Sequence, residues 1–389
     1  MNEQQAEQQT VAWDEDGTTR TARWRSESGA RPPKRVRTAD DRMTADAAYK
    51  LACEGTALLW RGDFHGARQL LSALARRVDR KPAKPGATPA ESFHLHRQAL
   101  SRRARVLGML LVPLESGDGA YTVPLRRAPE VHGACEAAYG PPDAGPSVLA
   151  LRELLGLVGA FEWQRKGVPV PALDGERVHP AYGVFSPVRG EYVDLVAGAP
   201  LPPGVGTAFD IGTGTGVLAA VLARRGVRRV VATDQDPRAL DCARANLERL
   251  GVRGTVDVVP ADLFPDAAEG RAGLVVCNPP WVPAKPTSPL EHAVYDPGSG
   301  MLRGFLGGLA ERLTEDGEGW LILSDLAEHL GLRTREELLG WIGAAGLEVA
   351  GREDIRPRHP RAADAGDPLH AARAAETTSL WRLRRAAGD

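Results

Sequence analysis

The sequence contains little lysine or cysteine, few aromatic residues and no long apolar run. The cysteines at 53, 135, 242 and 277 are far apart among 389 residues. This spacing argues against a disulfide framework and against a cysteine-based zinc site. The longest apolar stretch, residues 107–114, is far shorter than the ~20 residues that cross a bilayer, and the polar N-terminus has no apolar signal core. We therefore expect a cytoplasmic protein with reduced thiols and no membrane partner.

The sequence also lacks an excess of either positive or negative charge, since Lys and Arg total 49 and Asp and Glu total 50. The molecule as a whole therefore has no electrostatic bias towards nucleic acid. Six of the basic residues are Lys; the Arg, Ala, Gly and Pro usage fits a GC-rich bacterial genome. Residues 61–106 carry a local excess that suits either RNA phosphates or an acidic protein surface, or forms a solvated helix face. The excess comes from Arg61, Arg68, Arg76, Arg77, Arg80, Lys81, Lys84, Arg97, Arg102, Arg103 and Arg105.

The chain divides into three parts by composition. Residues 1–38 are polar and rich in Pro and Arg, which predicts a flexible polar arm. Residues 39–145 have apolar residues at three- and four-residue spacing, which predicts a mostly helical domain that presents the substrate. Its expected helices cover 44–60, 64–78 and 91–111, and a short strand is possible at 121–127. The third part is 146–389, which begins with a further helix near 147–163.

In this third part, apolar runs alternate with amphipathic helices, as in α/β proteins with a parallel sheet covered on both faces. The expected helices cover 214–225, 236–250, 299–315 and 334–346. The sequence predicts a seven-stranded, doubly wound, Rossmann-like sheet. Its expected strands lie near 206–211, 228–233, 255–259, 272–277, 318–323, 347–355 and 378–384.

A glycine loop follows the first of these strands, in the sequence AFDIGTGTGVLAA. Gly212, Gly214 and Gly216 allow a sharp turn and the close approach of a ligand. Asp234 ends the next strand and can accept hydrogen bonds from both hydroxyls of a ribose. These features predict a nucleoside-containing cofactor. The G-x-G-x-G spacing differs from the G-x-G-x-x-G of nicotinamide oxidoreductases, which argues against that class.

Asp210 precedes the glycines, where a carboxylate suits a cationic cofactor better than a pyrophosphate; its alternative role is to cap the turn. With these residues, the region resembles class I methyltransferases, whose cofactor is S-adenosylmethionine. The resemblance implies that Asp262 in PADLF lies near the adenine, whereas a helix N-cap is the alternative. The cofactor contacts implied in this way are Glu191, Asp210, Gly212, Thr213, Gly214, Gly216, Asp234, Gln235, Asp262, Leu263 and Asn278.

The fourth strand ends in Asn278, Pro279, Pro280 and Trp281, which we predict to be the catalytic residues. Prolines remove amide donors and leave carbonyl groups free to accept. A conjugated NH2 group is a poor nucleophile unless its hydrogens are held, and the Asn278 oxygen and the Pro279 carbonyl can hold them while Trp281 stacks on the planar group. Transfer then depends on alignment, which can contribute roughly 7–11 kcal/mol. No metal is required.

This motif resembles that of the N5-glutamine and N6-adenine methyltransferases, and residues 179–384 are most similar to the HemK-type protein-glutamine enzymes. HPAYGVFSPVRGEYVDLV at 179–196 resembles the segment before their first motif. The chain has Trp281 where that family usually has Tyr, and Arg189, Glu191 and Tyr192 where it has an acidic-threonine pattern. Glu191 is expected to hold the amino-acid end of the cofactor, or else to be a solvated carboxylate at a helix start.

The expected acceptor is macromolecular: a glutamine side chain of a protein such as a translation factor, or an adenine amino group in RNA or DNA that is swung out of its stack. Both acceptors fit the motif. A third possibility is a cofactor-binding module that recruits partners without catalysis, against which the retained Asn278 and Trp281 argue.

Overall fold

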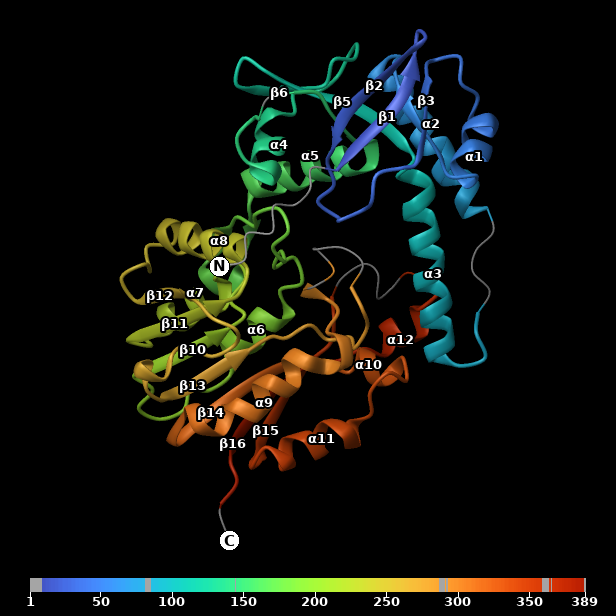
Figure 1. Ribbon diagram of the computed structural model, residues 1–389. Helices are drawn as coiled ribbons and strands as arrows, with labels where there is room; N and C mark the ends of the chain where they lie inside the picture. The colour runs from blue at the N-terminus through green and yellow to red at the C-terminus, as the bar shows by residue number, and fades with distance from the viewer. Residues whose placement is uncertain are drawn as a thin grey trace. The chain divides into compact units, whose positions relative to one another are not determined.

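The computed structural model describes residues 9–80, 85–143, 145–286, 291, 293–358, 364 and 366–387. These residues form two compact units (Figure 1). The first comprises the described residues of Met1–Pro85 and His94–Glu162, and the second those of Gly86–Phe93 and Trp163–Asp389. Within the described ranges, no helix combines the length and the apolar character needed to cross a membrane.

The second unit is built on a seven-stranded sheet, as the sequence predicts. The strands from β12 to β14 run parallel, whereas β16 is antiparallel to both of its neighbours. β11 and β12 lie on one side of β10, and β13 and β14 lie on the other side, so the direction of the strand order changes at β10. In spatial order the strands are β12 (Val256–Pro260), β11 (Arg229–Asp234), β10 (Thr207–Ile211), β13 (Ala272–Cys277), β14 (Leu313–Ser324), β16 (Thr378–Arg385) and β15 (Leu347–Ile355).

Helices cover both faces of this sheet (Figure 1). Because successive side chains of a strand point to opposite faces, Ala208 of β10 belongs to one core and Phe209 to the other. The Ala208 face packs against α6 (Glu191–Gly198), α7 (Val217–Arg224) and α8 (Pro237–Arg249). The Phe209 face packs against α9 (Gly300–Arg312) and α11 (Arg335–Ala344). Because the strands β12, β11, β10, β13 and β14 are parallel, their carboxyl ends all lie at the same end of the sheet. The predicted site residues lie at this end.

Shorter elements complete the description of this unit. They are β8 (Val168–Pro169), β9 (Arg177–Val178), α10 (Leu326–His329), α12 (His370–Ala375) and the 3₁₀ helices η1 (Pro171–Leu173), η2 (Ala267–Glu269) and η4 (Pro297–Ser299).

The first unit is also built on a seven-stranded sheet, of mixed direction. Its main path runs β1 (Thr10–Glu15), β2 (Thr18–Trp24), β7 (Ser147–Ala150), β5 (Leu110–Gly117), β4 (Thr56–Trp60) and β3 (Arg35–Ala39), and β6 (Ala120–Thr122) pairs with β5. The parallel pairs β3–β4 and β4–β5 need long crossovers. Helices provide them: α1 (Ala45–Cys53), α2 (Phe64–Asp79) and α3 (Pro89–Leu107), while α4 (His132–Tyr139) follows β6.

The prediction of a flexible arm over 1–38 is wrong for residues 10–38, and residues 1–8 lie outside the described ranges. β1 and β2 form a hairpin whose turn residues Asp16 and Gly17 have φ values of +53° and +74°. Asp-Gly between alternating apolar residues is a strong sequence signal for such a two-residue turn. The alternation places Trp13 and Trp24 in one core. The few apolar residues of this segment lie on a single face of the hairpin, which is why composition alone suggested disorder.

Helices make up most of the regular structure of residues 39–145, as predicted, but short buried runs that we assigned to helices form strands. Residues 44–60 contain α1 and then β4, which are separated by Gly55 at φ +78°. The expected helix over 91–111 ends before β5, and the one over 147–163 is β7 followed by α5 (Leu151–Lys166). Apolar runs of four or five residues do not distinguish a buried strand from a helix by periodicity.

The boundary between the units also differs from the predicted one at 145/146. Residues 86–93, which include the first turn of α3, group with the second unit. Phe93 on this turn is 3% exposed and packs with Val282 and Leu330 in an apolar cluster. The helix α3 therefore begins in the second unit and continues in the first.

Candidate active site

The glycine loop lies between β10 and α7, and its three glycines have left-handed backbone conformations. The φ values are +70° at Gly212, +55° at Gly214 and +80° at Gly216. A Cβ added to Gly216 would lie 3.2 Å from the Cβ of Ala243, so the loop packs directly on α8. At Gly214 the nearest atom would be 4.0 Å away, on Val184. The loop is thus packed at its helix end and open at its middle glycine.

Asp210 lies beneath this loop and is 1% exposed. Its Oδ2 accepts hydrogen bonds from the Thr213 hydroxyl at 2.6 Å and from the Ala219 backbone N–H at 3.1 Å. Burial raises the pKa of this carboxyl to about 6. Asp210 therefore fastens the loop to the first turns of α7, as the turn-capping alternative predicted. Its contact with a cofactor stays a prediction.

Asp234 ends β11 beside the loop and joins the two segments. Its Oδ2 accepts from the Gly214 backbone N–H at 3.0 Å, and its Oδ1 accepts from the Asp236 N–H at 3.0 Å. Burial raises the pKa of Asp234. A carboxylate has about four lone-pair sites, so these two donors leave lone pairs for hydroxyl groups. The neighbouring Gln235 is exposed.

The predicted adenine region follows β12. Asp262 is exposed, and it caps no helix, because the next helix, η2, begins at Ala267 and is capped by Asp266. The N-cap alternative for Asp262 is therefore wrong. Leu263 has φ +67°, and its carbonyl accepts from the Thr233 hydroxyl at 2.6 Å. This bond fixes the loop after β12 to the end of β11.

Glu191 begins α6 and is buried, which excludes the alternative of a solvated carboxylate. Its Oε1 accepts a hydrogen bond from the backbone N–H of Arg358. The side chain thus ties α6 to the segment after β15, and its predicted contact with the amino-acid end of the cofactor stays a prediction.

The Asn-Pro-Pro-Trp motif follows β13, and its two ends are joined by a side-chain hydrogen bond. The indole N–H of Trp281 donates to the Oδ1 of Asn278 at 2.9 Å. This bond orients the amide and leaves one lone pair on Oδ1. No described residue donates to the carbonyl of Pro279. Two acceptors for N–H groups are therefore available beside a partly buried Trp281 ring.

Two residues near this motif, Glu376 and Arg189, were not predicted to belong to the site. Glu376 precedes β16, is 1% exposed, and accepts from the Ser324 hydroxyl at 2.7 Å. The Nη1 of Arg189 lies 3.4 Å from the same carboxylate oxygen, and the guanidinium carbon of Arg189 lies 6.0 Å from the centre of the Trp281 ring. A glutamate between a short helix and a strand carries no sequence signal, so only the fold reveals this group of residues.

The glycine loop also contacts the start of α9. A Cβ added to Gly212 would lie 2.8 Å from the Cε of Met301. Asp296 fixes this end of the helix, because its two carboxylate oxygens accept from the backbone N–H groups of Met301 and Leu302 at 3.0 and 3.1 Å. The segment YDPGSGM thus supplies the N-terminal cap of α9 next to the loop.

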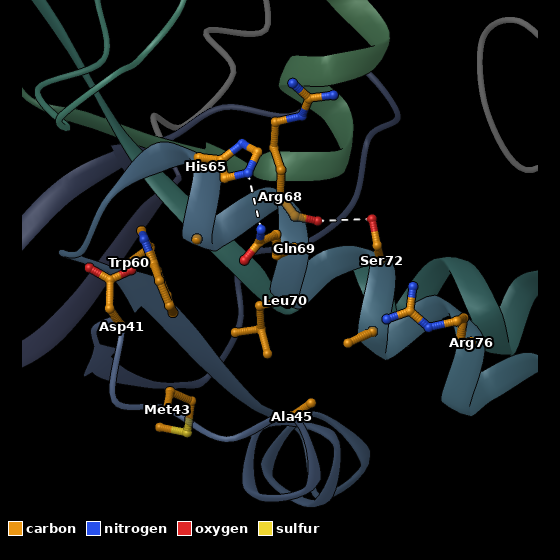
Figure 2. A pocket seen from close by; sticks show the side chains of 12 residues that line it. Asp41, Met43, Ala45, Trp60, His65, Arg68, Gln69, Leu70, Ser72 and Arg76 are labelled. Atoms are coloured by element: carbon orange, nitrogen blue, oxygen red, sulfur yellow. Dashed lines mark hydrogen bonds between the residues drawn. The ribbon is translucent and has the colours of Figure 1, made fainter.

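The basic segment 61–106 is partly neutralised by ion pairs. Arg61 pairs with Glu15, Arg77 with Asp46 and Arg103 with Asp79. Lys81 and Lys84 lie outside the described residues. Arg68 and Arg76 on α2 have no carboxylate partner within the described ranges, and they border a cavity of about 770 Å³ that is also lined by Asp41 and Trp60 (Figure 2). The cavity belongs to the first unit, and none of the predicted site residues lines it.

Comparison with known proteins gives a match over the second unit. Residues 181–326 match the Methyltransferase small domain family. The chain is 39% identical over 140 residues to the ribosomal protein L11 methyltransferase of Pelotomaculum thermopropionicum, covering 36% of this chain and 43% of that protein. It is 38% identical over 126 residues to the release factor glutamine methyltransferase of Mycolicibacterium smegmatis, covering 31% and 44%.

Among solved structures, the methyltransferase from Pyrococcus furiosus is 19% identical, with 59% of this chain and 98% of that chain covered and a TM-score of 0.40. The chain spans less than half the length of the two curated relatives named above. The match includes the glycine loop, Asp234 and the Asn-Pro-Pro-Trp motif. Over residues 181–326 the chain is therefore similar to the Methyltransferase small domain, and a release factor glutamine methyltransferase is among its relatives.

Proposed function

We propose that this protein is an N-methyltransferase that methylates the side-chain amide of a glutamine in a protein of the translation apparatus. The observation that carries the proposal is the pair of free acceptors beside Trp281: the second lone pair of the Asn278 Oδ1 and the Pro279 carbonyl. A primary amide nitrogen has two hydrogens in the plane of its conjugated group. Two fixed acceptors beside a flat aromatic ring match that geometry.

The residues of the glycine loop fit S-adenosylmethionine. The open side of Gly214 gives room for a close approach, and Asp234 has lone pairs left for the ribose hydroxyls. When bound, this cofactor supplies a methyl group on a positively charged sulfonium. The chain itself contributes orientation: Asn278 and Pro279 accept the amide hydrogens, and Trp281 holds the plane of the acceptor.

The names of the relatives support a protein acceptor. One is a ribosomal protein L11 methyltransferase, and another is a release factor glutamine methyltransferase whose name specifies the side chain that the motif suits. The partial pairing of the basic segment with Glu15, Asp46 and Asp79 reduces the charge available for a nucleic acid. We further propose that the first unit selects the acceptor, since the predicted cofactor and catalytic residues all lie in the second.

The test is to incubate the protein with methyl-labelled S-adenosylmethionine and a cell extract of its host, and then to digest the products. The proposal predicts that label is lost to protease and is recovered on glutamine after mass spectrometry of the peptides. Label that resists protease and is released by nuclease as methyladenine would replace the glutamine by an adenine acceptor. The Asn278→Ala variant, used in parallel, shows which label depends on this site.

A further inference from the structure

The side chain of Glu376 is fully shielded from solvent, with 0% of its surface exposed. A carboxylate removed from water needs a cation or several hydrogen-bond donors. Its Oε1 has the Ser324 hydroxyl at 2.7 Å and the Nη1 of Arg189 at 3.4 Å, whereas its Oε2 has no donor among the described residues. Arg189 is the one cation within ion-pair distance of Glu376 in the described part of the chain. The buried carboxylate of Glu376 therefore attracts the guanidinium group of Arg189 towards the sheet.

Arg189 contacts Trp281 as well as Glu376. The guanidinium carbon lies 6.0 Å from the centre of the Trp281 ring, within the range of a cation–π contact. The indole N–H of the same ring is engaged by Asn278 at 2.9 Å. The ring is consequently restrained at two places, by Asn278 at its polar edge and by Arg189 over the ring.

Building on the proposed function, we propose that Arg189 and Glu376 are positioning residues that set the plane of Trp281 against which the acceptor amide is held. Neither touches the reacting atoms. Glu376 fixes Arg189, Arg189 fixes the ring, and the ring together with Asn278 fixes the acceptor. Because the guanidinium is planar and stacks on aromatic rings, a lysine at this place keeps the charge but not the stacking.

The chain offers a matched control for this arrangement away from the loops of the site. Arg352 on β15 forms an ion pair with Asp354 at 2.6 Å, and its guanidinium carbon lies 4.8 Å from the centre of the Trp381 ring. An arginine, a carboxylate and a tryptophan thus meet there as well, and the guanidinium carbon of Arg335 also lies 5.2 Å from the centre of the Trp381 ring. The Arg352→Met variant measures what loss of such a contact does to a tryptophan that has no part in acceptor binding.

The first experiment follows the ring directly and needs no acceptor. The full chain is labelled with 5-fluorotryptophan, and the Trp281 resonance is assigned with Trp281→Phe. We expect Arg189→Met and Glu376→Gln each to shift or broaden the Trp281 resonance, and the double variant to change it no further than Arg189→Met alone, because Glu376 acts through Arg189. Arg352→Met should change the Trp381 resonance and leave that of Trp281 in place. An unchanged Trp281 resonance in both site variants would overturn the proposal.

The second experiment measures methylation kinetics on the protein acceptor identified with labelled cofactor. We expect Arg189→Met to raise the acceptor KM about tenfold, a typical loss for one cation–π contact with its ion pair. The Kd of S-adenosylmethionine should stay unchanged, and Arg189→Lys should recover part of the loss. A fall in kcat with unchanged KM, or an equal effect of Arg352→Met, would overturn the positioning role. If the wild type methylates no protein, the proposed function fails, while the fluorine spectra still decide the proposal for Arg189 and Glu376.

Discussion

Both units have an aspartate in a loop that joins a parallel strand to a helix, but the two carboxylates are used differently. In the first unit Asp63 follows β4, caps α2 through the His65 N–H at 2.8 Å, and pairs with Arg127 at 2.7 Å. In the second unit Asp234 ends β11, accepts from the backbone N–H groups of Gly214 and Asp236 at 3.0 Å, and lies beside an open loop. The first carboxylate is neutralised by an arginine of its own unit, whereas the second is held by backbone N–H groups and can still accept from a ligand.

The glycines of the two loops differ in the same way. A Cβ added to Gly62 in the first unit would lie 2.6 Å from the Oδ2 of Asp41, so the chain itself fills the space beside this glycine. At Gly214 the nearest atom would be 4.0 Å away. The two strand–loop–helix connections therefore differ in the space directly beside their glycines, although the first unit has a cavity of about 770 Å³ nearby, lined by Asp41 and Trp60. This agrees with the general rule that function depends on the site and not on the fold.

The largest expected effect separates chemistry from cofactor binding in the second unit. Asn278→Ala should lower kcat by about 10²–10³-fold, as removal of one preorganised hydrogen-bonding group at a reacting centre does. The Kd of S-adenosylmethionine, measured by calorimetry, should stay the same. Trp281→Ala should mainly raise the acceptor KM, while Trp281→Tyr retains much of the activity. A wild-type rate in Asn278→Ala would remove this residue from the mechanism.

The second effect tests whether the two units are stabilised separately. Phe93 and Phe64 are each 3% exposed, but Phe93 belongs to the second unit and Phe64 to the first. Truncation of a buried phenylalanine to alanine costs about 3–5 kcal/mol. Hydrogen exchange should show that Phe93→Ala weakens β10 to β14, and that Phe64→Ala weakens β3 to β5. Equal loss of protection in both sheets for either variant would show that the units unfold together.

The apolar cluster around Phe93 also affects the stability that we expect of a shortened chain that begins near residue 145. Such a chain keeps all seven strands of the second sheet but lacks Phe93. We expect it to bind S-adenosylmethionine, to be less stable than the full protein, and to methylate its natural macromolecule poorly. Full activity on that macromolecule would leave the first unit without a role in acceptor selection.

The third effect uses the opposite pKa shifts of two aspartates. Burial raises the pKa of Asp210 to about 6, from an ordinary value of 3.8. The folded state thus binds this proton more tightly than the unfolded chain, so the contribution of Asp210 to the free energy of unfolding falls as the pH rises from about 4 to about 6, and is constant above that. Asp210→Asn should abolish this fall and be more stable than wild type above pH 6, by up to about 3 kcal/mol.

Asp63 gives the control with the opposite sign. The hydrogen bond from Arg127 lowers its pKa, so its stabilising contribution is present above the unfolded value and is lost as the pH falls through the folded one. Asp63→Asn should therefore destabilise the first unit at neutral pH and remove this loss in acid. Urea unfolding between pH 3 and 8, together with hydrogen exchange of β4 and β10 over the same pH range, distinguishes the contribution of Asp63 from that of Asp210. A parallel pH dependence for both variants would contradict the assignment of signs.

The second sheet could be predicted from the sequence because its parallel strands contain distinct apolar runs that alternate with helices. The glycine loop and the Asn-Pro-Pro-Trp motif could be located for the same reason, since both directly follow such a strand. The first sheet was missed because its strands are short. The run ALLW in β4 is about one helical turn in length, so its pattern does not distinguish a strand from a helix. The Asp16-Gly17 turn does signal a hairpin, but it lies in a segment whose composition suggests disorder.

Part of the site was beyond prediction for a different reason. Glu376 and Arg189 are 187 residues apart in sequence and meet because α6, which follows Arg189, packs against β16, which follows Glu376. Residue type and spacing carry no information about such a contact. Likewise, only the structure shows that Asp262 caps no helix and that Asp210 is engaged by Thr213 and Ala219.

The smallest expected effect tests the difference between Asp234 and Asp63. Asp234→Ala should weaken S-adenosylmethionine binding about ten- to a hundredfold, since one hydrogen bond to a charged acceptor contributes roughly 1.5–3 kcal/mol. Part of this loss is indirect, because the Gly214 N–H loses its acceptor at 3.0 Å and the loop loosens. Asp234→Asn separates the two parts: its amide oxygen can still hold Gly214, but the charge that strengthens the ribose contact is gone. Calorimetry should rank the affinities wild type, Asn variant, Ala variant, with Asp63→Ala equal to wild type. If Asp63→Ala weakened binding as much as Asp234→Ala, the two carboxylates would not differ in function as their hydrogen bonds indicate.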